Sequence, residues 1–486
     1  MLLRVLLLLL LTSFAFAQPA VTSEWQPGTT ARGEQMRLLL QADPLHRDLP
    51  AYINRTYRLP RALPIVYQEH PKINAWYSPA EHRITVSYNL VAFLLDLFRR
   101  SGLPDPEQQT RATVDFILLH ELGHALIHEL DLPAVGREED SADEFATLIG
   151  LDALSDHGVG QSLAAANWFR LMGSSEVRLS ELAFWDEHSM NSQRFYKILC
   201  FLYGSNPTEL SPIISPLVPY TRLRLAHERY PQKVARWRRL LAAHQVTAGP
   251  YRLQTVTPEP ANPRSLTFVP AEGKLLPITE LTRRGNFAQM VSLLQATFKL
   301  PKNLTVVYKK VELQRNAFLP HSGQILLSQD FFDDAEARLS RRYPPAQTAE
   351  TMAALEKFSM LQEFAFALIA DADLAITGEP EDAAAELAMV LVASEPSLRP
   401  LGLPLTRWYE TLAAEKINVL QLKYWSESAL DQQRFYDMLG YLYVADPTTH
   451  ASVATQIPKK RLDKMAWEYQ QKQRNWSRLL QPFWRS

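Results

Sequence analysis

Apolar residues recur every three to four positions over most of the chain, and short alternating stretches separate these helical patterns. Residues 112–130 carry the clearest helical pattern and contain no proline. Residues 83–88 alternate between polar and apolar side chains, which is typical of a strand, and residues 65–67 are β-branched or aromatic. The patterns therefore predict an α+β protein in which helices predominate.

The same order of patterns occurs twice, at an offset of about 240 residues. Three short motifs of the first half return in the second, with residues 57–60, 65–67 and 74–76 matching residues 298–301, 306–308 and 316–318. A longer match joins residues 184–196 to residues 424–436, and both segments end in Gln-Arg-Phe-Tyr. Two copies at this period indicate a duplicated domain and exclude a solenoid.

Composition sets the predicted domain boundaries. Residues 18–35 are polar and predict a loose leader, and residues 36–245 form the first copy. Residues 246–275 are rich in proline and poor in periodicity, which is typical of a linker. The second copy then occupies residues 276–486.

Residues 1–17 predict export. Arg4 precedes an apolar run to Leu11, and Ala15-Phe16-Ala17 places small residues where a signal peptidase cleaves. The run is too short to span a bilayer comfortably, and no later segment is apolar for long enough. We therefore expect an exported protein, periplasmic or secreted, that has no membrane span once the signal is removed.

Charge and cysteine content exclude several classes of function. The 51 basic residues balance the 52 acidic ones, so nothing indicates a nucleic-acid partner. The single cysteine, Cys200, excludes an intramolecular disulfide and a four-cysteine zinc site.

The helix predicted over residues 112–130 contains His120-Glu121-Leu122-Gly123-His124, the H-E-x-x-H pattern of zinc hydrolases. Residues four apart lie on one face of a helix, so His120 and His124 can bind one zinc ion. Glu121 then lies next to the open position of the metal, where it can accept a proton from water.

The second copy lacks this motif. Gln362 replaces His120, and Phe366 replaces His124, so the second half is expected to bind no metal. Residues found only in the first copy are candidates for the chemistry, and residues found in both are candidates for holding the fold. The first group consists of His120, His124, Asp143, Asp186 and His188; the second includes Glu121, Glu139 and the run 193–196.

A catalytic zinc usually has three protein ligands and one water. Glu139, at the start of the next predicted helix, is the expected third ligand, with Glu138 and Asp140 as alternatives. Asp143, one turn later, is expected to accept a hydrogen bond from a ligand histidine. His128 lies on the same face as the motif but does not fit a three-histidine spacing.

Four further residues are candidates for the reaction and for substrate. His188 is the expected hydrogen-bond donor to the oxyanion, with Asp186 beside it. Asn74 and Tyr77 precede the strand of residues 84–88, which is predicted to pair as an edge strand with an extended substrate.

These motifs together resemble a bacterial family known only as proposed metallopeptidases of unknown function. The resemblance rests on residues 120–124, 136–146 and 186–196, with residues 74–77 in addition. The spacing of Glu139 and Asp143 is similar to that of gluzincin peptidases, in which a helix after the motif supplies a glutamate ligand and an aspartate partner. The resemblance implies a zincin-like fold and bound zinc, but no particular substrate.

The sequence thus predicts an exported zinc metallopeptidase acting on peptides or proteins, followed by an inactive copy that packs on it with approximate twofold symmetry. Two other functions fit the same residues. One is a binding or scaffolding protein in which zinc is structural, and the other is a zinc amidase acting on cell-wall peptides.

Overall fold

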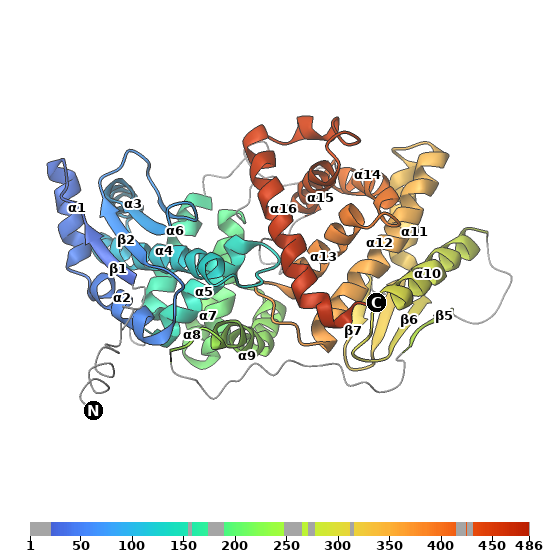
Figure 1. Ribbon diagram of the computed structural model, residues 1–486, viewed down its shortest axis with the longest axis horizontal. Helices are drawn as coiled ribbons and strands as arrows, with labels where there is room; N and C mark the ends of the chain where they lie inside the picture. Colours follow the sequence, from blue (N-terminus) through green and yellow to red (C-terminus); the bar gives the residue numbers. More distant parts are fainter. Residues whose placement is uncertain are drawn as a thin grey trace, which may run out of the picture.

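The computed structural model describes residues 21–153, 158–173, 189–246, 265–270, 278–311, 315–414, 424 and 431–485. Figure 1 shows two halves side by side, each with a small sheet at its outer part and helices toward the other half. The protein is α+β and mostly helical, as the sequence predicts.

The first half contains a four-stranded sheet in the order β1-β2-β4-β3. Its strands are β1 (Val21–Trp25), β2 (Leu63–Gln68), β3 (Ala75–Ser78) and β4 (Arg83–Ser87). The first three in this order run parallel, and β3 closes one side as an antiparallel edge strand. Because β1 pairs with β2, the predicted leader already contributes to the sheet.

The prediction that residues 84–88 form an edge strand is wrong. β4 is bonded to β2 on one side and to β3 on the other, so it has no free edge for a substrate. The strand also ends at Ser87, whose side chain accepts from the backbone N–H of Asn89 and begins the next helix. The edge strand next to the candidate site is β3, which contains Tyr77.

In the first half, two helices lie between β1 and β2 in sequence, and the other described helices follow β4. The helices of this half are α1 (Ala31–Gln41), α2 (Pro44–Thr56), α3 (Tyr88–Ser101), α4 (Pro106–Glu129), α5 (Glu138–Ala153), α6 (Gly158–Gly173), α7 (Asn191–Ser205), α8 (Pro207–Ile214) and α9 (Tyr220–Ala242). In the described part of the chain, no helix combines the length and apolarity that crossing a bilayer requires.

The second half repeats the sheet in the order β5-β6-β8-β7. Its elements are β5 (Leu266–Pro270), α10 (Ile278–Thr297), β6 (Leu304–Lys309), β7 (Ala317–Leu319), β8 (Gln324–Ser328), α11 (Gln329–Ser340), α12 (Pro345–Asp371), α13 (Pro380–Ser394), α14 (Gly402–Ala413), α15 (Asp431–Ala445) and α16 (Lys459–Leu480). β5 lies within the predicted linker and pairs with β6, so the second fold begins before residue 276. Phe195 and its counterpart Phe435 are both buried, which agrees with the structural role expected for the run 193–196.

Close packing of α4 against α5 sets the position of the candidate site. Asp105 caps α4, and Pro106 at its first position fits the fixed φ of a helix start. At Gly123 the two helices approach so closely that a Cβ atom would lie 3.2 Å from the Cα of Ala142. This glycine therefore permits the approach that brings the first two turns of α5 next to the H-E-x-x-H face.

The two halves contact each other through equivalent residues. Arg239 on α9 donates two hydrogen bonds to Asp373 after α12. Arg478 on α16 donates to Asp131 after α4. Arg478 is the counterpart of Arg239, and Asp131 is the counterpart of Asp373, so the same ion pair forms twice with the two halves exchanged. Contacts that repeat with the partners exchanged are those of an isologous interface, so the halves are related by an approximate twofold axis.

The centre of this interface is buried. Val135, in the loop between α4 and α5, is fully buried within the hydrophobic core of the second half. Gln193 donates to its own counterpart, Gln433, at 3.3 Å. Arg229 on α9 forms two hydrogen bonds with Glu381 on α13, at 2.9 and 2.6 Å. Apolar burial and paired charges thus both hold the halves together.

Candidate metal centre

Three side chains from α4 and α5 converge on one point. Nε2 of His120 lies 3.1 Å from Nε2 of His124. Oε2 of Glu139 lies 3.2 Å from the first of these nitrogens and 3.3 Å from the second. His120 and Glu139 are buried, and His124 is nearly so.

These distances fit a zinc ion. Ligand atoms about 2.0–2.1 Å from a tetrahedral zinc lie about 3.3 Å from one another. Two imidazole nitrogens and one carboxylate oxygen also form a ligand set that is common for catalytic zinc, which leaves a fourth position for water. His120, His124 and Glu139 are therefore the residues that would hold the metal.

Each imidazole is oriented by a second carboxylate. Nδ1 of His120 lies 2.8 Å from Oδ1 of Asp143, and Nδ1 of His124 lies 2.7 Å from Oε1 of Glu138. An N–H bonded to a carboxylate at Nδ1 leaves the lone pair on Nε2, the atom that faces Glu139. Both rings are thus arranged to bind a metal through the same nitrogen.

The structure separates the three acidic residues at the start of α5. Glu139 lies at the convergence point, whereas Glu138 bonds to Nδ1 of His124 and also lies 2.9 Å from Nε2 of His128. Glu138, His124 and His128 form a second, less buried group that could hold a metal ion. Asp140 belongs to neither group and instead accepts hydrogen bonds from Ser189 and Lys197.

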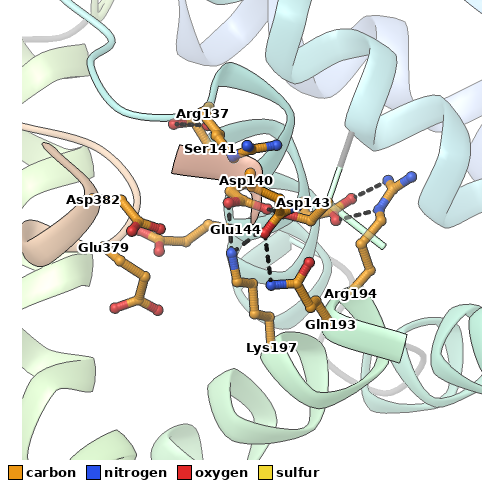
Figure 2. Close-up of polar contacts among 12 residues, drawn as sticks. Arg137, Asp140, Ser141, Asp143, Glu144, Gln193, Arg194, Lys197, Glu379 and Asp382 are labelled. Atoms are coloured by element: carbon orange, nitrogen blue, oxygen red, sulfur yellow. Dashed lines mark hydrogen bonds and ion pairs between the residues drawn. The ribbon is translucent and has the colours of Figure 1, made fainter. Parts of the chain in front are cut away.

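Arg194 belongs to the candidate site although the sequence predicts only a structural role for it. It donates from Nε to Oδ2 of Asp143 at 2.7 Å and from Nη2 to Oδ1 at 2.6 Å (Figure 2). Its guanidinium lies 4.1 Å from the centre of the Phe169 ring. Arg194 therefore fixes the carboxylate that in turn orients His120. Because the second copy has Arg434 at the same position, the comparison of the two copies assigns Arg194 to the fold and not to the site.

The buried charges compensate one another. Burial opposes the charged form of Asp143, but Arg194 and His120 outweigh it and hold the pKa of the carboxyl well below its usual range. Burial likewise opposes a charged His120, whereas its bonds to Asp143 and Glu139 raise the imidazole pKa above its ordinary value. The chain Arg194–Asp143–His120 thus keeps its carboxylate ionised in a buried setting.

Glu121 lies where α4 meets the edge strand. Its Oε2 accepts a hydrogen bond from the backbone N–H of Tyr77 on β3, at 2.8 Å. The Tyr77 hydroxyl donates to Glu129 at the end of α4, at 2.7 Å. Asn74 lines the same cleft, and its carbonyl accepts from the Ser87 N–H. The predicted residues Asn74 and Tyr77 are thus brought close to the motif.

The same contact explains why a glutamate persists in the second copy. Glu363 on α12 accepts from the backbone N–H of Phe318 on β7, also at 2.8 Å. This bond joins the long helix to the edge strand in both copies, whether or not a metal can bind. Glu381, the counterpart of Glu139, is kept by its ion pair with Arg229 across the interface. Neither glutamate therefore indicates chemistry in the second half.

Replacing Glu363 with Gln should stabilise the protein at neutral and alkaline pH. Burial, opposed by the Phe318 N–H, raises the pKa of Glu363 from about 4.5 to about 7. Between these values the native state binds a proton that the unfolded chain has released, so stability falls as pH rises. At pH 8 we expect Glu363→Gln to raise the free energy of unfolding by about 3 kcal/mol, and with it the unfolding temperature.

At about pH 3 the two proteins should unfold at the same temperature, because the glutamate is then neutral in both the folded and the unfolded state. Calorimetry at the two pH values measures the difference. An equal gain at both values would show that the carboxyl does not titrate in this way.

The candidate centre opens into a cleft of about 660 Å³. The cleft is lined by the α4 motif, by the loop before β3 and by residues of α13, α15 and α16 from the second half. Two predicted residues, Asp186 and His188, lie outside the described residues.

Comparison with known proteins agrees with this geometry. The family model described as "Putative metallopeptidase" (DUF4344) matches residues 25–241 and again residues 277–480. No curated protein and no solved structure matches the chain. Because the two matched regions span most of the sequence, the chain belongs to this metallopeptidase family and contains two tandem copies of its domain.

Proposed function

We propose that the protein is an exported, zinc-dependent hydrolase of peptide bonds, with its one active centre in the first half. The observation that supports this best is the convergence of His120, His124 and Glu139 at the spacing of zinc ligands. The centre lies in a cleft large enough for several residues of a peptide. Export rests on the signal-like residues 1–17.

Each residue of the centre has a separate role in this proposal. A bound zinc would polarise the carbonyl of the substrate and lower the pKa of a water molecule. Glu121 accepts the proton of that water and returns it to the amine that leaves. The bond from the Tyr77 N–H orients the Glu121 carboxylate within the cleft. His188 remains the proposed donor to the oxyanion, with Asp186 beside it.

The second half is proposed to be inactive. Ala385 stands where the first copy has Asp143, and Pro380 stands where it has Glu138. Phe366 replaces the second histidine, and its ring packs edge-on against Phe318 at 6.1 Å. An aromatic contact thus occupies the place of a ligand, and no histidine remains on this face of α12.

The purified mature chain should bind one zinc ion. Elemental analysis by mass spectrometry should find one zinc per chain, and His120→Ala should remove it because a buried ligand is lost. Gln362→Ala, the change at the equivalent position of the second copy, should leave the zinc content unchanged. Two zinc ions per chain, or retention of zinc by His120→Ala, would contradict the assignment.

Hydrolysis itself can be tested without knowing the natural substrate. The zinc-loaded chain is incubated with a denatured protein and, separately, with peptidoglycan fragments. Mass spectrometry then identifies new amino termini. Cleavage within the polypeptide supports a peptidase, whereas cleavage of the fragments alone favours an amidase, and no cleavage of either favours a binding protein.

A further inference from the structure

The cleft beside the candidate centre is closed on one side by the second half. Helix α16 runs along the face of that half that is turned toward the first (Figure 1). Asn475 on this helix donates to the Ala134 carbonyl at 2.9 Å, in the loop between α4 and α5. Nearer the start of the helix, Lys464, Trp467 and Gln471 line the cleft. The inactive copy therefore forms part of the wall of the active one.

Trp467 on α16 contacts the helix that carries the metal-binding motif. Its ring lies 5.2 Å from the ring of His128. His128 stands one turn beyond His124 on α4 and stacks on Tyr77 at 5.7 Å. Trp467 thus contacts a residue of the metal-binding helix, and that same residue stacks on the edge strand.

Two large apolar side chains are exposed within this cleft, one from each half. Trp467 is 39% exposed, and Ile73, in the loop before β3, is 55% exposed. Both line the cleft. Exposed apolar side chains that line a concave site are typical of a site that binds an apolar group. Neither side chain belongs to the hydrophobic core of its half.

Comparison of α16 with α9, its counterpart in the first half, distinguishes Trp467 from the structural residues of α16. Trp476 on α16 and its counterpart Trp237 on α9 are both buried, and each donates its indole N–H to a glutamate of the same half. At the position of Trp467, by contrast, α9 carries Glu228. The tryptophan that faces the cleft is thus specific to the copy that lacks the metal ligands.

We propose that Trp467 and Ile73 form a subsite for a large apolar side chain of an extended peptide substrate. The inference rests on the proposed metal centre and assigns a substrate-binding role to the inactive copy. The peptide would lie between β3 and α16, with its apolar side chain between the two exposed residues. Trp467 is then a specificity-determining residue supplied by a domain that has no chemistry of its own.

The test compares two metal-binding probes on the zinc-loaded full chain by titration calorimetry. Acetohydroxamate carries the metal-binding group alone, and N-acetyl-leucine hydroxamate adds one apolar side chain. Burying a leucine side chain should strengthen binding of the second probe by about tenfold or more. Trp467→Ala should remove most of that gain and leave the binding of acetohydroxamate unchanged. Trp467→Phe should restore much of it.

Glu228→Ala, the matched position on α9, should change neither probe, and thermal unfolding identifies any variant that is misfolded. An equal gain in Trp467→Ala and in the unmodified chain would overturn the subsite while the metal centre stands, as would a leucine probe that binds no better than acetohydroxamate. Failure of acetohydroxamate to bind the unmodified chain would overturn the proposed centre and the subsite with it.

Discussion

Glu121→Gln should slow peptide hydrolysis by orders of magnitude while the protein keeps its zinc. Glu121 is not among the three converging ligands, and an amide oxygen can still accept the hydrogen bond from the Tyr77 N–H. The variant therefore keeps the geometry and loses only the group that accepts a proton. General-base catalysis contributes about 10²- to 10⁴-fold, so a loss of this size in kcat is expected. Initial rates and zinc content are measured on the same preparation.

The matched control is Glu363→Gln, which makes the same change at the equivalent helix-to-strand bond of the second copy. It should leave the rate of hydrolysis unchanged. A Glu121→Gln protein that lacks zinc would mean that this residue helps to hold the metal. A Glu121→Gln protein that retains full activity would show that another group accepts the proton.

The sequence predicts the part of this site that depends on local spacing. His120 and His124 are one helical turn apart, so their shared face follows from the geometry of any helix. Glu139 and Asp143 are also one turn apart, and the structure brings both to His120. The spacing places each pair on one face of a helix, but the approach of the two helices depends on packing at Gly123.

The contacts that the sequence does not predict are those between distant segments. The bond between Glu121 and β3 depends on which strand lies at the edge of the sheet. β3 precedes β4 in sequence but lies outside it in the sheet, so the order of residues along the chain does not identify the edge strand. The comparison of the two copies also fails at Arg194. It assumes that a shared residue has a shared role, but Arg194 bonds to Asp143, whereas the second copy has Ala385 at the position of Asp143.

Arg194→Met should destabilise the first half and weaken zinc binding. The substitution keeps an apolar chain near Phe169 but leaves Asp143 buried without its cation. Removing one partner of a buried ion pair typically costs about 3–5 kcal/mol in the free energy of unfolding. Loss of a group that orients a ligand typically weakens metal affinity by about 10- to 100-fold. Chemical denaturation and competition with a zinc chelator measure the two effects.

Arg434→Met is the matched control in the second copy. An oxygen of Asp382 lies 3.7 Å from Arg434, and Ala385 stands where the first copy has Asp143, so the second copy has no equivalent of the 2.6 Å bond between Arg194 and Asp143. This variant should therefore leave zinc affinity unchanged. The double variant Arg194→Met, Asp143→Asn should recover much of the lost stability, because no charge is then buried unpaired. Equal zinc affinity in Arg194→Met and Arg434→Met would refute the role of Arg194, since only the first of these arginines bonds to a carboxylate that orients a candidate ligand.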